Sequence, residues 1–144
     1  MLSRWLAAMR WLLEWSEEAC LHCGRTLVRA RERRVGLCVG CLGRIAWVRP
    51  PTCARCGKPL RLTGVTLCAD CRARPVPFVS SHGAAVYDGL WRELVWRFKF
   101  DRRRELARPL GVAMAEVAWR AGLPSRVHAL VPVPVSAERL ARRG

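Results

Sequence analysis

All eight cysteines of this chain occur in pairs that are separated by two residues. The pairs are Cys20/Cys23, Cys38/Cys41, Cys53/Cys56 and Cys68/Cys71, and no cysteine is left over. Two intervening residues let a tight turn aim both sulfurs at one tetrahedral ion, so two such pairs supply the four thiolates of a structural zinc site. The sequence therefore predicts two structural Zn²⁺ sites. Because sulfur fills every coordination position, neither site has room for a catalytic water.

The same cysteines allow other interpretations, which the spacing disfavours. A disulfide framework belongs to secreted proteins, but no secretory signal precedes four regular C-x-x-C units. A thioredoxin-like redox motif needs one such pair beside a βαβ pattern, whereas this chain has four. The simplest zinc grouping follows chain order, with the first four cysteines on one ion and the last four on the other. Spacing alone leaves an interleaved grouping open.

The cysteine segment is an internal repeat. The stretches "CLHCGRTL" (residues 20–27) and "CARCGKPL" (residues 53–60) lie 33 positions apart and share both cysteines, a glycine, a basic residue and a leucine. Gly24 and Gly57 follow the second cysteine of each pair, where a residue without Cβ lets the backbone turn beneath the sulfurs. The repeat predicts two zinc ribbons in tandem. Loops this small bury little apolar area, so we expect the metal to contribute their folding free energy.

The chain is strongly basic, with 26 Lys and Arg against 11 Asp and Glu and a formal net charge of +15. Such a charge favours polyanionic partners such as nucleic acid or phosphorylated metabolites. All but two of the bases are arginines, however, which a GC-rich genome would also produce. Within the first ribbon, "RARERR" (residues 29–34) is predicted to be a basic hairpin tip that contacts a phosphate backbone through Arg31, Arg33 and Arg34. The alternative is a solvated loop.

The first 18 residues predict an amphipathic helix rather than a targeting segment. Arg10 and Glu14 interrupt the apolar run, no small-residue cleavage site follows, and the stretch is too short and too charged to span a membrane. We therefore expect no stable membrane insertion and a cytoplasmic protein. The apolar residues recur at helical spacing, which favours docking of this helix on its own protein.

The remaining pattern predicts a second domain of α/β type. We assign residues 1–18 to the helix, 19–73 to the double zinc ribbon, 74–79 to a linker and 80–144 to the second domain. A strand is expected in Ser81–Gly89 and a helix from Leu90, in which Glu93 can pair with Arg97. Another helix is expected over Arg103–Ala121, which Pro109 either kinks or begins and Gly122 ends. The expected apolar stripe of this helix is Leu106, Leu110, Met114 and Val117. His128–Val135 is expected to be a central strand whose carboxyl end opens into a loop, where α/β proteins place ligands.

These motifs, in this order, resemble the ComF family of phosphoribosyltransferase-like proteins, which are associated with DNA uptake in bacterial competence. The resemblance rests on the paired C-x-x-C ribbons, "CARCGKPL", "AAVYDG", "FKF" before a basic helix, and "VPVPVSAERLARRG" (residues 131–144). The fold class that it implies is a small zinc-ribbon module with two four-cysteine sites, followed by the N-terminal part of an α/β phosphoribosyltransferase-like domain. The family pattern continues through Phe-Asn-Gln to an Asp-Asp…Thr-Thr-Gly loop for phosphoribosyl pyrophosphate (PRPP), so we expect this sequence to be a C-terminally truncated fragment.

The resemblance also implies site residues. The Pro-Val-Pro loop and two nearby arginines would bind pyrophosphate through backbone N–H groups and positive charge. These residues are Val131, Pro132, Val133, Pro134, Val135, Ser136, Arg139 and Arg143. Mg²⁺ and PRPP are expected only in a full-length form, because catalysis requires the acidic loop. We therefore assign no catalytic residue and expect this fragment not to turn over alone.

The sequence leaves two classes of function open. The first is a ComF-like protein that handles single-stranded DNA or phosphoribosyl metabolites, with competence-machinery proteins as partners. The second is a non-enzymatic double zinc ribbon that binds nucleic acid or docks a partner protein. In the second case Trp91, Trp96, Phe98 and Phe100 would stack on bases, although the helical apolar face predicts several of them to be core.

Overall fold

The computed structural model describes residues 19–74 and 76–143. The amphipathic helix expected at residues 1–18 lies outside the described residues. The chain divides into two compact units, Met1–Arg44 and Ile45–Gly144, and the boundary falls between the two cysteine segments. Each unit therefore contains one ribbon of its own.

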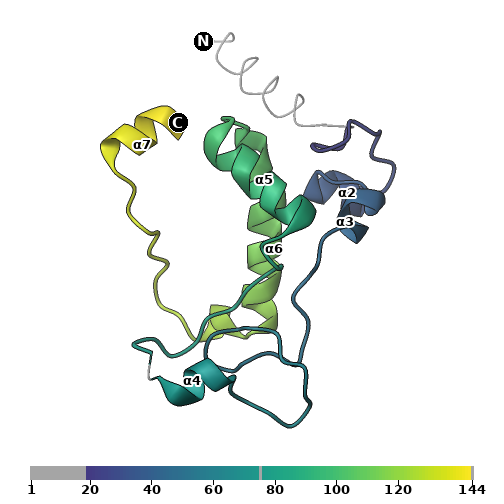
Figure 1. Ribbon diagram of the computed structural model, residues 1–144. Coiled ribbons are helices and arrows are strands. Elements are labelled where there is room, and N and C mark those ends of the chain that lie inside the picture. The colour runs from purple at the N-terminus through teal and green to yellow at the C-terminus, as the bar shows by residue number, and fades with distance from the viewer. Residues whose placement is uncertain (1–18, 75, 144) are drawn as a thin grey trace. The chain divides into compact units, whose positions relative to one another are not determined.

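The first unit builds its ribbon from a tight turn and two short helices (Figure 1). An isolated antiparallel bridge between Ala19 and Thr26 closes the turn that carries the first cysteine pair. The helices α2 (Ala30–Val35) and α3 (Val39–Gly43) follow, and α3 carries the second cysteine pair at its start. The buried leucines Leu27 and Leu37 are 2% and 1% exposed, so they form the small apolar core beside the sulfurs.

The prediction of a hairpin tip at residues 29–34 is wrong, because this segment forms α2. The Glu32 carboxylate accepts a hydrogen bond from the backbone N–H of Arg29 at 2.9 Å, which caps the first turn. At the other end, Gly36 has φ 83° and donates its N–H to the Glu32 carbonyl at 2.6 Å. A glycine in the left-handed region is a common end for a helix. The local capping signals thus favour a helical turn over a hairpin.

The second unit begins with a ribbon of similar construction. The bridge between Thr52 and Pro59 closes its first turn, and α4 (Ala69–Ala73) carries its second cysteine pair. Gly57 adopts φ 71°, and a Cβ at this position would lie 2.5 Å from the Ser81 carbonyl oxygen. The backbone of residue 81 therefore approaches the turn so closely that only glycine fits there.

Two helices form the apolar core of the remainder of the second unit. They are α5 (Gly89–Phe100) and α6 (Ala107–Arg120) (Figure 1). The short 3₁₀ helix η1 (Arg104–Leu106) joins them and contacts both. The Asp88 side chain accepts a hydrogen bond from the Gly89 N–H at 2.8 Å at the start of α5. The predicted pair of Glu93 and Arg97 forms at 2.6 Å. Leu94 and Leu106 are fully buried and lie at the centre of this core.

Within the helix expected over Arg103–Ala121, α6 covers Ala107–Arg120 and η1 precedes it, and the expected apolar stripe differs at one position. Pro109 lies in the first turn of α6 and so begins the helix rather than kinking it. Leu106 and Leu110 are buried as expected, whereas Met114 is 68% exposed and Ala113 takes the buried position. The expected end is confirmed by Gly122, which has φ 66°.

Neither strand expected in the second unit forms. Ser81–Gly89 contributes only an isolated bridge between Trp47 and Ala85, and His128–Val135 makes no bridge. In the second segment Leu130 and Val133 are 91% and 88% exposed. A strand needs a neighbour for its N–H and C=O groups, and Pro132 and Pro134 also lack the N–H. The described residues therefore show isolated bridges and helices, and the α/β part of the predicted fold class is not seen in them.

Two short helical elements complete the described chain, η2 (Leu123–Ser125) and α7 (Ala137–Arg143). Among the described helices, none combines the length and the apolar character that crossing a bilayer requires.

Candidate metal centres

The first ribbon gathers its four cysteine sulfurs into one cluster. The Sγ atoms of Cys20, Cys23, Cys38 and Cys41 all lie within 4.8 Å of one another. The Sγ atoms of Cys23 and Cys38 are 3.7 Å apart, far beyond the bond length of about 2.0 Å that a disulfide requires. All eight cysteines are free thiols. Four free sulfurs in one cluster are the ligand set of a closed zinc site.

The second ribbon repeats this geometry closely. The sulfurs of Cys53, Cys56, Cys68 and Cys71 also lie within 4.8 Å of one another, and those of Cys56 and Cys68 are again 3.7 Å apart. The structure therefore groups the cysteines in chain order, four in each unit. The interleaved grouping that the spacing left open does not occur.

The backbone of each ribbon turns its N–H groups toward the sulfurs. Cys38 donates its N–H to the Cys20 Sγ at 3.4 Å, and Cys68 donates to the Cys53 Sγ at 3.4 Å. The first turns match as well, because Gly24 and Gly57 each have φ 71° and donate to the carbonyl four residues earlier at 2.9 Å. The N–H groups that face sulfur stabilise negative charge on it, which favours the thiolate that a metal ion binds.

The thiols in a cluster differ in how readily they ionise. Burial raises the pKa of Cys20, but N–H groups of Cys23, Cys38 and His22 outweigh burial and lower that pKa to about 7. At Cys53, N–H groups led by that of Cys56 lower the pKa to about 6.

The last thiol of each cluster shows the opposite effect. Burial and neighbouring thiols raise the pKa of Cys71 to about 12, and the same causes raise the pKa of Cys41. The last proton leaves with difficulty because it would place a further negative charge among the other sulfurs. A divalent cation removes this obstacle.

Zn²⁺ fits both clusters. A tetrahedral ion with Zn–S distances of about 2.3 Å requires sulfurs about 3.8 Å apart, and the Cys23–Cys38 and Cys56–Cys68 pairs lie at 3.7 Å. The two four-cysteine sites thus fit two structural zinc ions, as the sequence predicted. Because sulfur fills all four coordination positions, both zinc ions would be structural. Their binding would therefore contribute free energy to folding.

Glu32 is a structural residue that the sequence reasoning missed. Its side chain is 7% exposed, and its two carboxylate oxygens accept hydrogen bonds from the Arg29 N–H at 2.9 Å and the Val39 N–H at 2.7 Å. These bonds lower the pKa of Glu32. Val39 follows Cys38 directly, so Glu32 joins the start of α2 to the turn that holds the second cysteine pair. A glutamate in the first turn of a helix is a recognisable capping signal, but the contact with residue 39 is not local.

His22 is the second residue that the sequence reasoning missed. Its Nδ1 lies 3.4 Å from the Cys41 Sγ, which is hydrogen-bonding distance for sulfur. The tautomer with Nδ1 protonated donates to this sulfur. In the second ribbon the equivalent position is Arg55, so the two clusters have different surroundings. A donor outside the ligand set commonly tunes metal affinity.

The three arginines predicted to contact nucleic acid lie on α2 and are not equivalent. Arg33 Nη1 donates to the carbonyl oxygens of Leu27 and Val28, at 3.2 and 2.7 Å. Its guanidinium therefore joins α2 to the segment that precedes it in the first ribbon. Arg31 and Arg34 are exposed. Because Arg33 has a structural role, its replacement would disturb the ribbon itself. Arg31 is therefore the better position at which to test contact with phosphate.

The residues implied to bind pyrophosphate are exposed along an extended segment. Val131, Val133 and Val135 are 86%, 88% and 46% exposed, and the exposed segment also includes Pro132, Pro134 and Ser136. Ser136 Oγ accepts the N–H of Arg139 at 3.4 Å at the start of α7, which ends at Arg143. No cluster of donors forms around this segment in the described residues, so its binding role stays a prediction.

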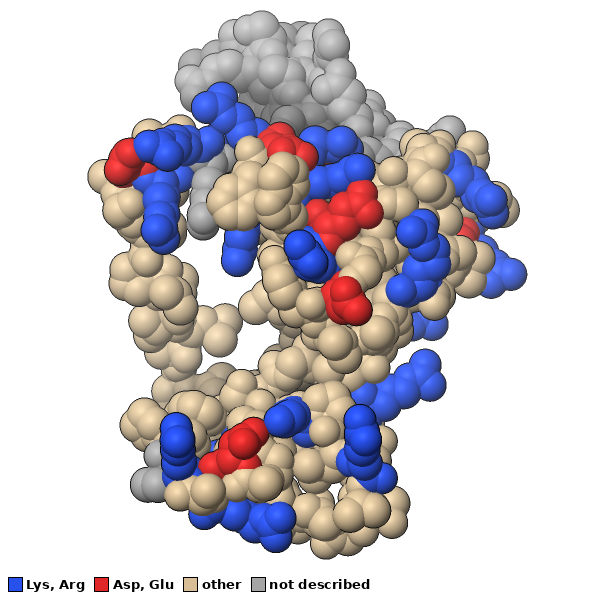
Figure 2. Space-filling model, viewed as in Figure 1, with Lys and Arg blue, Asp and Glu red and all other residues tan. Residues whose placement is uncertain are grey.

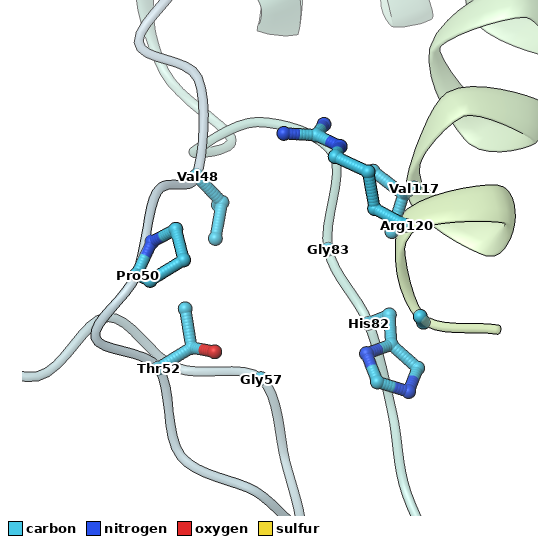
Figure 3. A pocket seen from close by; sticks show the side chains of 9 residues that line it. Val48, Pro50, Thr52, Gly57, His82, Gly83, Val117 and Arg120 are labelled. Carbon is cyan, nitrogen blue, oxygen red and sulfur yellow. The ribbon is translucent and has the colours of Figure 1, made fainter.

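A cavity of about 200 Å³ in the second unit contains none of these predicted residues (Figure 3). Its lining comes from the second ribbon, the segment at residues 82 and 83, and the end of α6. Among its lining residues only His82 and Arg120 are titratable, and His82 Nε2 lies 3.2 Å from Ser80 Oγ.

Replacing Cys23 and Cys38 by serine together tests the grouping of the cysteines. Their sulfurs belong to one cluster, so we expect the double variant to retain one zinc ion per chain, measured by native mass spectrometry. The matched variant with Cys38→Ser and Cys68→Ser removes one ligand from each cluster and should retain none. An interleaved grouping predicts loss of both ions from the first variant, which would contradict this assignment.

Replacing His22 by alanine tests its contact with Cys41. We expect zinc affinity at the first site to fall by about 10- to 100-fold, because the sulfur loses a donor outside the ligand set. Competition with a chromophoric chelator measures this affinity. Arg55→Ala at the equivalent position is the control and should leave the second site unchanged. Equal losses in the two variants would show that His22 has no specific role.

The comparisons with known proteins agree with this geometry. Residues 10–72 match the sequence model of a double zinc ribbon domain, a stretch that contains all eight cysteines. Neither the comparison with curated proteins nor that with solved structures finds a match. With two four-cysteine clusters in the same stretch, the chain contains a zinc-binding double zinc ribbon domain.

Proposed function

We propose that this chain is a ComF-like protein that binds single-stranded DNA through its zinc ribbons in the bacterial cytoplasm, in association with DNA uptake and natural transformation. The proposed DNA binding rests on one observation, the charge of each ribbon, whereas the ComF-like assignment rests on the resemblance of the motifs. Residues 19–44 contain six arginines and one acidic residue, Glu32, which is buried and hydrogen-bonded. Residues 45–74 contain six basic residues and one acidic residue, Asp70.

The bound metal does not cancel this charge. A Zn²⁺ ion with four thiolates carries a net charge of about −2, so each ribbon keeps an excess of positive charge after the site is counted. Figure 2 shows Lys and Arg side chains spread over the visible face, with few Asp and Glu between them. A rigid, metal-held loop that presents arginines is suited to bind a phosphate backbone.

The phosphoribosyltransferase-like role remains part of the proposal only by resemblance. In a ComF-like protein the segment from Val131 to Ser136 would offer backbone N–H groups to pyrophosphate at the end of a strand. That arrangement needs further strands beside the segment and an acidic loop for Mg²⁺ and PRPP. For residues 1–144 we therefore propose binding of nucleic acid, with competence proteins as the expected partners.

Arg31→Gln tests contact of the first ribbon with phosphate. We expect the wild-type chain to bind a labelled oligothymidine with an affinity that falls steeply with salt. A plot of the logarithm of the association constant against the logarithm of the salt concentration should have a slope of about −0.7 per phosphate contacted. The variant should make this slope less negative by about 0.7, because it loses one contact. Fluorescence anisotropy over a salt series measures both quantities.

The control is zinc content, which should stay at two ions because Arg31 is exposed on α2 and is not a ligand. A ribbon that docks a protein partner instead would give no salt-dependent DNA binding. Binding of the wild-type chain that is absent or insensitive to salt would reject the proposed function.

A further inference from the structure

The outward face of α5 carries two aromatic side chains. Trp96 is 51% exposed and Phe100, one turn later, is 60% exposed. Their ring centroids lie 5.6 Å apart with the ring planes inclined by 47°, so the rings touch without stacking face to face. Because the rings are inclined and exposed, a flat group from outside can still approach them.

This exposure follows from the register of the helix. The buried residues of α5 are Leu90, Trp91 and Leu94, which lie on one side. At about 100° per residue, Trp96 lies about 200° around the helix from Leu94 and so points away from the core. Of the four aromatics considered as stacking residues, Trp91 is therefore core, Phe98 is half-buried, and the other two are exposed.

Two basic residues flank the exposed rings. Arg92 lies one turn before Trp96, and Lys99 lies three residues after it on the same side of the helix. Both are exposed. The acidic residue within α5, Glu93, pairs with Arg97 at 2.6 Å and thus offsets the charge of that arginine, and Asp101 follows Phe100 at the C-cap. The aromatic face, defined as Arg92, Trp96, Lys99 and Phe100, is accordingly positive.

We propose that the aromatic face binds single-stranded nucleic acid, with bases stacked on Trp96 and Phe100 and phosphates close to Arg92 and Lys99. The inference rests on the proposed function and names a second surface for the same ligand. Exposed aromatic rings among cations are the usual means of binding a single strand without sequence preference. A duplex hides the faces of its bases, so this surface should prefer unpaired strands.

Trp96→Leu is the sharpest variant, because it keeps an apolar side chain and removes the ring. We expect affinity for an oligothymidine of about 16 nucleotides to fall by about 5- to 150-fold, which is the loss of one stacked base. Trp96→Tyr keeps a ring and should recover most of the affinity. An apolar docking surface for a protein would tolerate leucine, so equal DNA affinity of Trp96→Leu and wild type would overturn the inference.

A strand with abasic sites provides the second half of the test. Wild type should bind an abasic strand of the same length more weakly than oligothymidine, because no base can stack. Trp96→Leu should reduce the affinity for the abasic strand less than the affinity for oligothymidine. Removing the base and removing the ring abolish the same contact, so their effects should not add. Equal losses on the two strands would show that Trp96 does not stack on a base and would overturn the inference.

Trp119→Leu is the matched control. Trp119 is 77% exposed on α6, so it offers a similar loss of aromatic surface on another helix. This variant should bind DNA as wild type does, and each variant should retain two zinc ions. Failure of the wild-type chain to bind any DNA would reject the proposed function and this inference together. Wild-type binding that Trp96→Leu leaves unchanged would reject only the inference.

Discussion

Tetrahedral coordination by four thiolates is the constraint on which each ribbon depends. Four sulfurs must lie about 3.8 Å apart although their charges repel one another, and only a cation makes that arrangement stable. In the second ribbon the buried cluster consists of Cys53, Cys68 and Cys71, with Cys56, Leu60 and Leu67 packed against it. So small an apolar core cannot offset the entropy of ordering these loops. The metal site is therefore the core of the ribbon as well as its ligand cluster.

The two ribbons meet this constraint with the same first turn and with different surroundings. Both have a bridge, a glycine at φ 71° and an N–H···S bond at 3.4 Å. Between its cysteine pairs the first ribbon is three residues longer and contains α2, which Glu32 joins to the second pair. The second has Lys58 paired with Asp70 at 3.0 Å, an exposed contact of small energetic value. The repeat therefore preserves the site while its surface varies.

The sequence predicted local geometry well and long-range pairing poorly. The C-x-x-C spacing and the glycine after each pair define the zinc sites, because both act within a few residues. The contact of His22 with Cys41 and that of Glu32 with Val39 join residues distant in the chain, and no pattern marks them. The strand expected at His128–Val135 failed for the same reason, because strands form only beside other strands. The helices of the second unit were predictable from the period of their apolar residues. The exception is one position of α6, where Ala113 is buried and Met114 is exposed.

X-ray absorption at the zinc edge tests the central claim most directly. On the purified chain, with metal content measured in the same sample, we expect two zinc ions per chain, each with four sulfur neighbours at about 2.3 Å. That result would establish that the eight cysteines form two closed thiolate sites and that His22 lies outside the ligand set. A shell containing nitrogen or oxygen, or a chain with disulfides and no zinc, would contradict the account.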